Sequence, residues 1–206
     1  MKVKKGNIFI TMGLLLIAVA LLITVFNFVQ NNMALKASEE ALARLRAEMV
    51  VAKENSLNEL TADEEPLYKT YEDMTMPDII INGEEYIGVL SVPSLSLELP
   101  IKGEFSYDAL KTAPCRYDGS VYKNNMIIAG HNYPAHFSGL KTLKIGDRVA
   151  FTDGDGNQFL YSVSDIVQID GMDVDGMKAG DWDMTLFTCN LSGKARVTIR
   201  LEALDK

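Results

Sequence analysis

The stretch TLFTC at residues 185–189 decides how this sequence is interpreted, and Arg196 follows its cysteine seven positions later. Threonine, leucine and phenylalanine favour a strand, and the Asn, Ser and Gly residues within 190–193 favour a turn after it. Apolar and polar residues then alternate over 195–204, which predicts a returning strand. Two antiparallel strands joined by a short loop would bring Cys189 and Arg196 close together.

A thiol beside a guanidinium suits acyl transfer. Cys189 is the candidate nucleophile, and because a free thiol is mostly protonated at neutral pH it needs a cation or base nearby. Arg196 would supply a permanent positive charge for the substrate and for the oxyanion. Arg200 is the alternative, because its even spacing from Arg196 places both on one face of a strand. Thr188 would add a hydroxyl or backbone contact.

The acid–base residue should be a histidine, and the chain has only His131 and His136. His131 ends the apolar run 126–129, a predicted strand, so its side chain would emerge at a strand end. His136 lies in the loop that follows and is the alternative, as an exposed bystander or a substrate contact. We therefore favour His131 as the general acid and base.

The composition indicates one well-cored domain with additions. The 206 residues are 48% hydrophobic and 23% charged, with a formal net charge of -8. Such an acidic balance argues against nucleic acid as a partner. The two cysteines are too few for a disulfide framework.

The N-terminal segment predicts a membrane anchor. Three lysines within residues 1–7 precede an uncharged apolar run at 8–29, and about 20 apolar residues span a bilayer as a helix. The run is longer than the core of a cleavable signal peptide, and no good cleavage site follows it. The lysines place residues 1–7 in the cytoplasm and the remainder outside, in a single-pass topology.

Residues 30–60 are rich in helix formers and predict a solvated helical stalk. Leu35, Leu42 and Met49 are seven apart, which is compatible with a short coiled-coil seam. Residues 61–83 are acidic and irregular and predict a linker or an arm strapped onto the domain.

Residues 84–206 predict a β-domain. Short strand-like runs recur with little helix between them, which favours a sandwich or a closed barrel. The runs at 148–151 and 158–163 flank an Asp-Gly turn at 153–157 and predict a hairpin.

These residues carry a resemblance to a known family. TLFTC at 185–189 resembles the TLxTC signature of the sortases, the cysteine transpeptidases of Gram-positive cell envelopes. The other matching pieces are AGHN at 129–132, YIGVLSVP at 86–93, LPI at 99–101 and IGD at 145–147. The resemblance covers roughly 84–204. It implies a mainly β fold, a closed sortase-like barrel of about eight strands behind the membrane helix and the stalk.

The resemblance also implies a reaction. Such an enzyme cleaves an LPxTG-like C-terminal sorting signal between Thr and Gly and forms a thioester on the cysteine. It then transfers the protein to an amine, on a peptidoglycan precursor or on a pilin lysine. Met76-Pro77-Asp78 does not match the Asp-Pro-aromatic lid motif of pilin-polymerising members, which tilts the interpretation toward protein anchoring. A thiol hydrolase without an acceptor amine fits the same residues.

Two further alternatives concern cysteine pairing and calcium. A Cys115–Cys189 disulfide would silence the thiol and make the chain a non-catalytic, membrane-tethered β module. Some sortases bind calcium in a loop before the cysteine strand, where this chain has Asp170, Asp173, Asp175, Asp181 and Asp183. We favour a solvated acidic loop and no metal site. No cofactor is expected to be required, and calcium stimulation is the weaker hypothesis.

Overall fold

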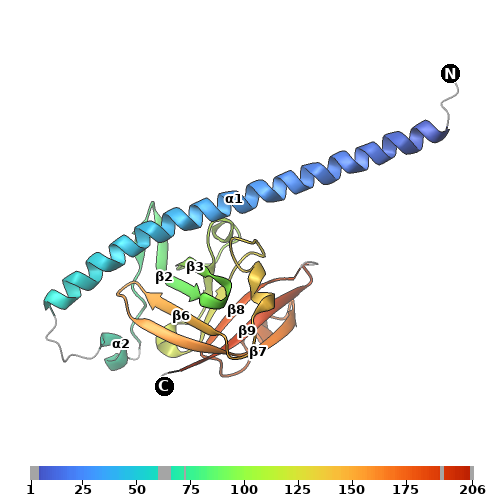
Figure 1. The fold of residues 1–206 in the computed structure, drawn as a ribbon. Coiled ribbons are helices and arrows are strands. Elements are labelled where there is room, and N and C mark those ends of the chain that lie inside the picture. The colour runs from blue at the N-terminus through green and yellow to red at the C-terminus, as the bar shows by residue number, and fades with distance from the viewer. Residues whose placement is uncertain (1–4, 60–65, 72, 191–192, 205–206) are drawn as a thin grey trace.

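The computed structural model describes residues 5–59, 66–71, 73–190 and 193–204 of the chain, and in the first helix it describes the side chains of residues 8–52. A long helix lies across a β-domain (Figure 1). The helices are α1 (Lys5–Glu59), α2 (Leu67–Thr70) and α3 (Val174–Lys178), with short 3-10 turns η1 (Pro93–Leu95), η2 (Ala109–Lys111), η3 (Val121–Lys123) and η4 (Ser138–Thr142). The strands are β1 (Ile79–Ile81), β2 (Glu84–Val92), β3 (Leu97–Lys102), β4 (Cys115–Asp118), β5 (Met126–Ala129), β6 (Arg148–Asp153), β7 (Gln158–Asp170), β8 (Met184–Cys189) and β9 (Ala195–Ala203).

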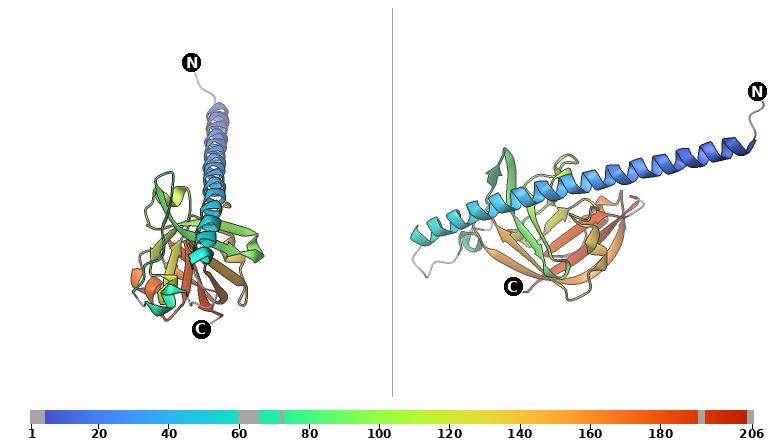
Figure 2. Two further views of the ribbon diagram at one scale, coloured as in Figure 1. Left: turned by 90° about the vertical axis from the view of Figure 1, so that its left-hand side faces the viewer. Right: turned by 45° about the horizontal axis from the view of Figure 1, so that its top comes forward.

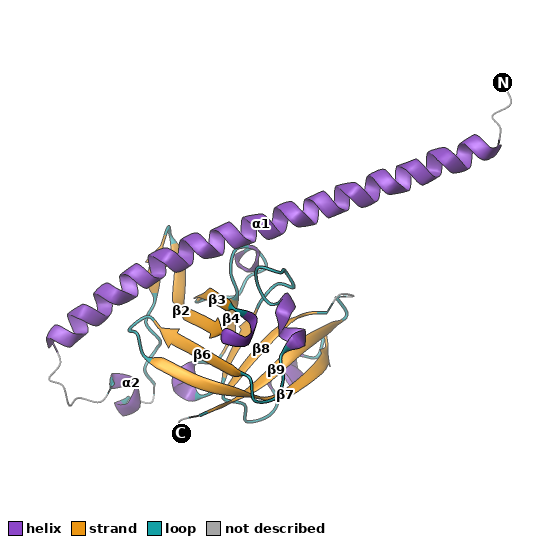
Figure 3. Ribbon diagram, viewed as in Figure 1, coloured by secondary structure: helices purple, strands orange, loops and turns teal. Residues whose placement is uncertain are grey.

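Eight of these strands close into a barrel (Figure 3). The order is β1-β2-β3-β4-β5-β8-β9-β7-β6, and β6 pairs back onto β2. Strand β1 is an addition, because it pairs with residues 84–86 of β2 whereas β6 pairs with residues 88–91. Gly88 sits beside the bulge between these two parts, where a Cβ atom would lie 2.1 Å from the Thr152 carbonyl oxygen. The mainly β, closed eight-stranded fold expected from the sequence is confirmed.

Strand β8, which carries the TLFTC stretch, is buried on both faces. Met184 and Leu186 point into the barrel core with Ile199 of β9, and all three are fully buried. On the outer face, Phe187 packs with Ile127 of β5 in a second apolar cluster. Loops cover this outer face, and a hollow beneath them is where the candidate site lies.

One strand prediction needs correction. The run at 158–163 is only the first part of a longer strand, β7, which has an irregularity between Val163 and Asp165 and pairs first with β6 and then with β9. The last four residues of β3 are all buried, because α1 packs on the outer side of this strand.

Helix α1 runs without a break from the predicted anchor into the predicted stalk. No Pro or Gly occurs in it after Gly13, so nothing interrupts its hydrogen-bond ladder. The side chains of 8–29 are exposed except at Gly13, and in Figure 2 this part of the helix projects beyond the barrel. In the described part of the chain, one helix is long and apolar enough to cross a membrane.

The part of α1 beyond residue 30 is not solvated on all sides. Ala34, Ser38, Ala41, Leu45 and Met49 are buried at spacings of three and four, the pattern of one helix face. Small side chains at the first three positions let the helix approach the barrel closely.

The expected stalk therefore becomes part of the folded domain. Leu45 and Met49 pack against Tyr86 and Val89 of β2 in an apolar cluster of their own. Leu35, one member of the expected seam, is 40% exposed. The buried stripe shares Met49 with the predicted seam and otherwise runs through other residues, because the helix packs on a barrel, not on another helix.

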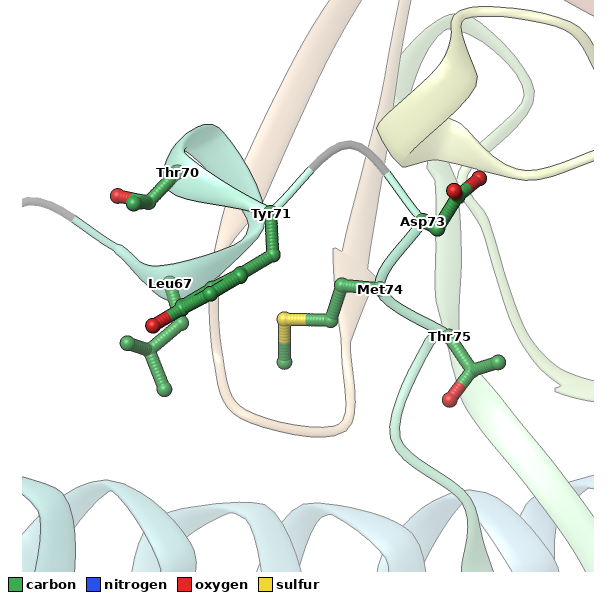
Figure 4. Close-up of a pocket in the computed structure, with 6 residues that line it drawn as sticks. All are labelled: Leu67, Thr70, Tyr71, Asp73, Met74 and Thr75. Carbon is green, nitrogen blue, oxygen red and sulfur yellow. The ribbon is translucent and has the colours of Figure 1, made fainter.

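The described residues 66–71 and 73–78 form an arm that packs on the barrel near Tyr122, the end of the barrel at which β5 begins. Met76 is buried in the barrel core, and the Tyr68 ring stacks on Tyr122 with centroids 4.7 Å apart. Figure 4 shows Tyr71 and Met74 turned toward a hollow within this arm, where the Met74 amide donates to the Tyr71 carbonyl at 3.1 Å. Of the two possibilities for 61–83, the described part fits a strapped-on arm.

The docking of α1 can be tested by shortening its most buried side chain. We expect Leu45→Ala to lower the free energy of unfolding by about 2–4 kcal/mol, because it leaves a cavity between helix and barrel. Chemical unfolding of the full chain in detergent micelles measures this. The matched control Leu35→Ala should change it by less than about 0.5 kcal/mol. Equal effects of the two substitutions would show that the helix does not dock in this way.

Candidate active site

Cys189 and Arg196 face each other across two antiparallel strands. Cys189 is the last residue of β8, and its partner in the register is Arg196, near the start of β9. Cys189 is partly exposed. The hairpin inferred from the sequence is therefore present, and it places the guanidinium-bearing residue opposite the thiol.

His131 reaches the same place through a parallel pairing. Ala129, the end of β5, is paired with Phe187 of β8, and the Gly130 amide donates to the Phe187 carbonyl at 3.0 Å. Counting two residues on from each member of this pair leads to His131 and Cys189. Parallel strands that leave the sheet in the same direction thus deliver both side chains to one edge.

The three candidate residues line one pocket of about 310 Å³. Its other walls come from segments far apart in the sequence, the loop around Phe105, strand β4 and the loop before α3. The walls are aromatic, since Phe105 meets Tyr117 edge-on at 5.2 Å and Tyr117 meets Phe187 edge-on at 5.3 Å. Apolar walls around a thiol, an imidazole and a guanidinium suit an extended peptide with an apolar residue near the bond to be cleaved.

The surroundings of His131 favour its neutral form. Burial is the main cause that lowers the pKa of this histidine, and the charge of Lys111 lowers it further. Its ring stacks on Tyr133 with centroids 4.7 Å apart. A neutral imidazole at neutral pH can accept a proton.

Arg196 is held by a backbone carbonyl, and this is the hydrogen bond that its guanidinium makes among the described residues. Its Nη1 donates to the Gly193 carbonyl at 3.3 Å. Gly171 lies against it, and a Cβ atom there would come within 3.2 Å of Nη1 and 2.9 Å of the Lys194 carbonyl oxygen. A glycine at 171 therefore leaves room for the guanidinium at the pocket edge.

The alternative arginine has a different place. Arg200 is 4% exposed and pairs with Thr185, four residues before Cys189. Its guanidinium donates to the carbonyls of Met177 and Gly176, each at 2.7 Å, and to the Thr185 hydroxyl at 2.9 Å. Arg200 is thus a brace that ties α3, a wall of the pocket, to the barrel, and it is not among the residues that line the pocket.

Thr188 and His136 also lie away from the pocket. Thr188 is adjacent to Cys189 in a strand, so its side chain points to the other face, where it is 3% exposed. His136 is 1% exposed, so it is not the exposed bystander that was one of the two alternatives, and it is not among the residues that line the pocket. Burial lowers its pKa to about 4.

The cysteines are not bridged. Cys115 and Cys189 are both free, and Cys115 is fully buried against Ala129 in the outer apolar cluster. Burial raises the pKa of the Cys115 thiol to about 11, which makes it unreactive. The alternative of a structural Cys115–Cys189 disulfide finds no support.

Three of the five aspartates before β8 accept hydrogen bonds from backbone amides. Asp170 accepts from the Met172 amide, Asp173 from the Gly176 amide and Asp183 from the Ala203 amide. Within the part of the chain that the structure describes, no three His, Cys, Asp or Glu side chains gather as metal ligands would. Calcium stimulation stays a prediction of the sequence.

Comparison with known proteins agrees with this geometry. The family model for the sortase domain matches residues 90–203. The chain belongs to the sortase family. Sortase A of Bacillus anthracis is 32% identical over 116 residues, which cover 53% of this chain and 54% of that protein, so the match spans about half of the relative.

Solved structures share the fold of this sortase. A Clostridium perfringens sortase D5 transpeptidase has a TM-score of 0.56 at 20% identity, over 84% of this chain and 99% of that one. A C. perfringens sortase C with the C-terminal cell wall sorting motif has a TM-score of 0.53 at 21% identity, over 91% and 100%. Identities this low show the fold alone, and the names span several sortase classes.

The sequence interpretation missed the aromatic walls and Tyr133. Phe105 and Tyr117 lie far from Cys189 along the chain, and nothing in their spacing distinguishes them from aromatic residues of the core. Tyr133 had a signal, since it lies two residues after His131 and directly follows the segment at 129–132 quoted for the family resemblance.

Substitution of the two arginines should change the free energy of unfolding by different amounts. Arg200→Met would leave two carbonyls of the α3 segment without donors, so we expect the free energy of unfolding to fall by about 1–3 kcal/mol. Arg196→Met removes one long hydrogen bond at the surface and should change it by less than about 1 kcal/mol. Chemical unfolding measures both, and similar losses would contradict the brace assigned to Arg200.

His136 should make stability depend on pH. Its folded pKa of about 4 lies below the ordinary value of about 6.5, so between these pH values the unfolded chain binds a proton that the folded chain does not. We expect stability to fall by up to about 1.4 kcal/mol per pH unit as the pH drops through this window, and the effect to end below it. Unfolding at several pH values measures the slope. In His136→Gln the excess slope should vanish, whereas an unchanged slope would refute the assignment.

Proposed function

We propose that this sortase is a membrane-anchored cysteine transpeptidase that cleaves an LPxTG-like sorting signal and transfers the protein to a cell-wall precursor amine. The observation that carries the proposal is that Cys189, His131 and Arg196 line one pocket with apolar walls. The related C. perfringens sortase C structure contains the C-terminal cell wall sorting motif, which supports a substrate of this kind.

The proposed reaction has two acyl transfers. His131 takes the proton of the Cys189 thiol as the sulfur bonds to the carbonyl carbon of the Thr–Gly bond, and it gives that proton to the departing amine as the C–N bond breaks. The acceptor amine then attacks the thioester and loses a proton to His131, which passes it to the Cys189 sulfur as the C–S bond breaks. Arg196 holds the substrate and balances the negative charge of the oxygen in both steps. No cofactor enters these steps, and an assay with calcium or a chelator tests the stimulation hypothesis.

The membrane anchor is part of the proposal. The exposed apolar run of α1 would cross the membrane, with residues 1–7 in the cytoplasm and the barrel outside. The position of the arm at 66–78 favours protein anchoring over pilin polymerisation. Tyr68 packs on Tyr122, before the start of β5, whereas His131 follows the end of the same strand, so the described part of the arm does not cover the pocket. A pilin lysine as acceptor and simple hydrolysis are the alternatives.

The test uses the full chain in detergent micelles with an LPxTG-type peptide library and intact-mass detection. We expect an acyl adduct that Cys189→Ala abolishes. An added amine, either a peptidoglycan stem peptide or a lysine peptide, should release it as a transpeptidation product. Arg196→Ala should lower kcat/KM by about 10²–10³-fold, while Arg148→Ala on β6 serves as the matched control. Release by water alone would indicate a hydrolase, and no adduct on a folded chain would reject the proposal.

A further inference from the structure

A continuous line of contacts joins α1 to His131. It begins at Ser38, which is 3% exposed although it lies on a helix that mostly faces solvent. The Ser38 hydroxyl donates to the Thr112 carbonyl at 2.9 Å and lies 3.4 Å from Nε2 of His136. The second histidine, which the proposed reaction does not use, is therefore the point where the helix meets the loop after β5.

The single proton of the Ser38 hydroxyl determines which tautomer His136 adopts. A serine hydroxyl has one proton, and here it is donated to Thr112. Nε2 must then carry the proton of the neutral ring and point it at Ser38, which leaves Nδ1 unprotonated, buried and without a partner among the described residues. His136 thus has one tautomer and one orientation in this arrangement.

Tyr133 connects His136 to His131. Its ring contacts both imidazoles, with centroids 5.8 Å from His136 and 4.7 Å from His131. The planes of Tyr133 and His131 are inclined by 29°, so these rings stack. The flat face of the candidate catalytic imidazole is therefore supported by a residue that is itself packed against His136.

The backbone of the loop is held as well. The His136 amide donates to the Tyr133 carbonyl at 2.9 Å, and the Phe137 amide donates to the His131 carbonyl at 3.1 Å. From α1, the Asn31 side-chain oxygen accepts from the Ala135 amide at 3.0 Å. The helix thus touches the loop at Asn31 and again at Ser38, two turns apart on the same face.

We propose that Tyr133 and His136 are positioning residues that hold the His131 imidazole in the pocket, and that Ser38 and Asn31 of α1 set their placement. The helix that would anchor the chain is then also a support of the acid–base residue. A displacement of about 1 Å in a catalytic group can lower a rate about 10²-fold, so a contact this indirect is expected to matter for chemistry. The inference rests on the proposed function, because it assigns His131 a role in the reaction.

The experiment uses the full chain in detergent micelles with the LPxTG-type peptide and an amine acceptor. We expect Tyr133→Leu to lower kcat by about 10–100-fold with KM changed by less than about twofold, because stacking is lost but the pocket walls remain. Tyr133→Phe keeps the ring and should retain kcat within about twofold. Ser38→Ala should lower kcat by about 3–10-fold, since His136 loses its acceptor.

The matched control is Leu45→Ala, which weakens the contact between α1 and the barrel away from this line. At temperatures where it stays folded, its kcat should lie within about twofold of the wild type. If Leu45→Ala and Tyr133→Leu lower kcat equally, the effect is one of helix docking and the inference fails. If Tyr133→Leu leaves kcat unchanged, it fails as well.

A second readout does not need a substrate. The chain has two histidines, so ¹³C-histidine labelling yields two ring signals, which His136→Gln assigns. We expect Tyr133→Leu to raise the His131 pKa toward its ordinary value, because the ring becomes more hydrated, and Tyr133→Phe to leave it unchanged. If the peptide is not turned over by the wild type, the proposed function fails while this titration still decides the positioning: an unmoved His131 pKa in Tyr133→Leu would overturn it.

Discussion

The parallel pairing of β5 with β8 is the constraint on which the candidate site depends. It sets Ala129 opposite Phe187, and the two chains then leave the sheet side by side with His131 and Cys189 as their next functional residues. The antiparallel pairing of β8 with β9 adds Arg196 from the other side. Two of these side chains lie on strands and the third lies just after one, and they meet because backbone hydrogen bonds fix the register of the strands. A one-residue slip of either pairing would turn a side chain to the opposite face.

The outer face of these strands explains why the site is a pocket. Phe187, Ile127 and Cys115 make the outer face apolar, so it must be covered, and the loop around Phe105 and helix α3 cover it. Arg200 contributes by tying the α3 backbone to β8 and β9. Burial of apolar surface on both sides of the strands thus creates both the barrel core and the walls of the site.

Helix α1 has more than one role in this architecture. The same uninterrupted helix carries the exposed apolar run and then packs its buried stripe on the barrel. A rigid connection of this kind fixes how the barrel sits relative to the apolar run. The sequence interpretation did not foresee it, because Ala34, Ser38 and Ala41 carry little hydrophobic signal, and a stripe of small residues shows as an interface only when its partner is known. Of the more visible leucines, Leu35 is exposed and Leu42 is only partly buried against this face.

The sequence by itself determined the β-domain, the apolar N-terminal helix and the short list of candidates, because strand alternation, turn residues and an uncharged run are local signals. It left Arg196 and Arg200 open, since both lie on one strand face, and it left His136 as a surface residue. Only the tertiary structure placed Arg196 opposite Cys189, buried Arg200 beneath α3 and packed His136 against Ser38. These outcomes depend on register and on contacts between segments far apart in the chain, and no periodicity along one segment encodes what another segment brings to it.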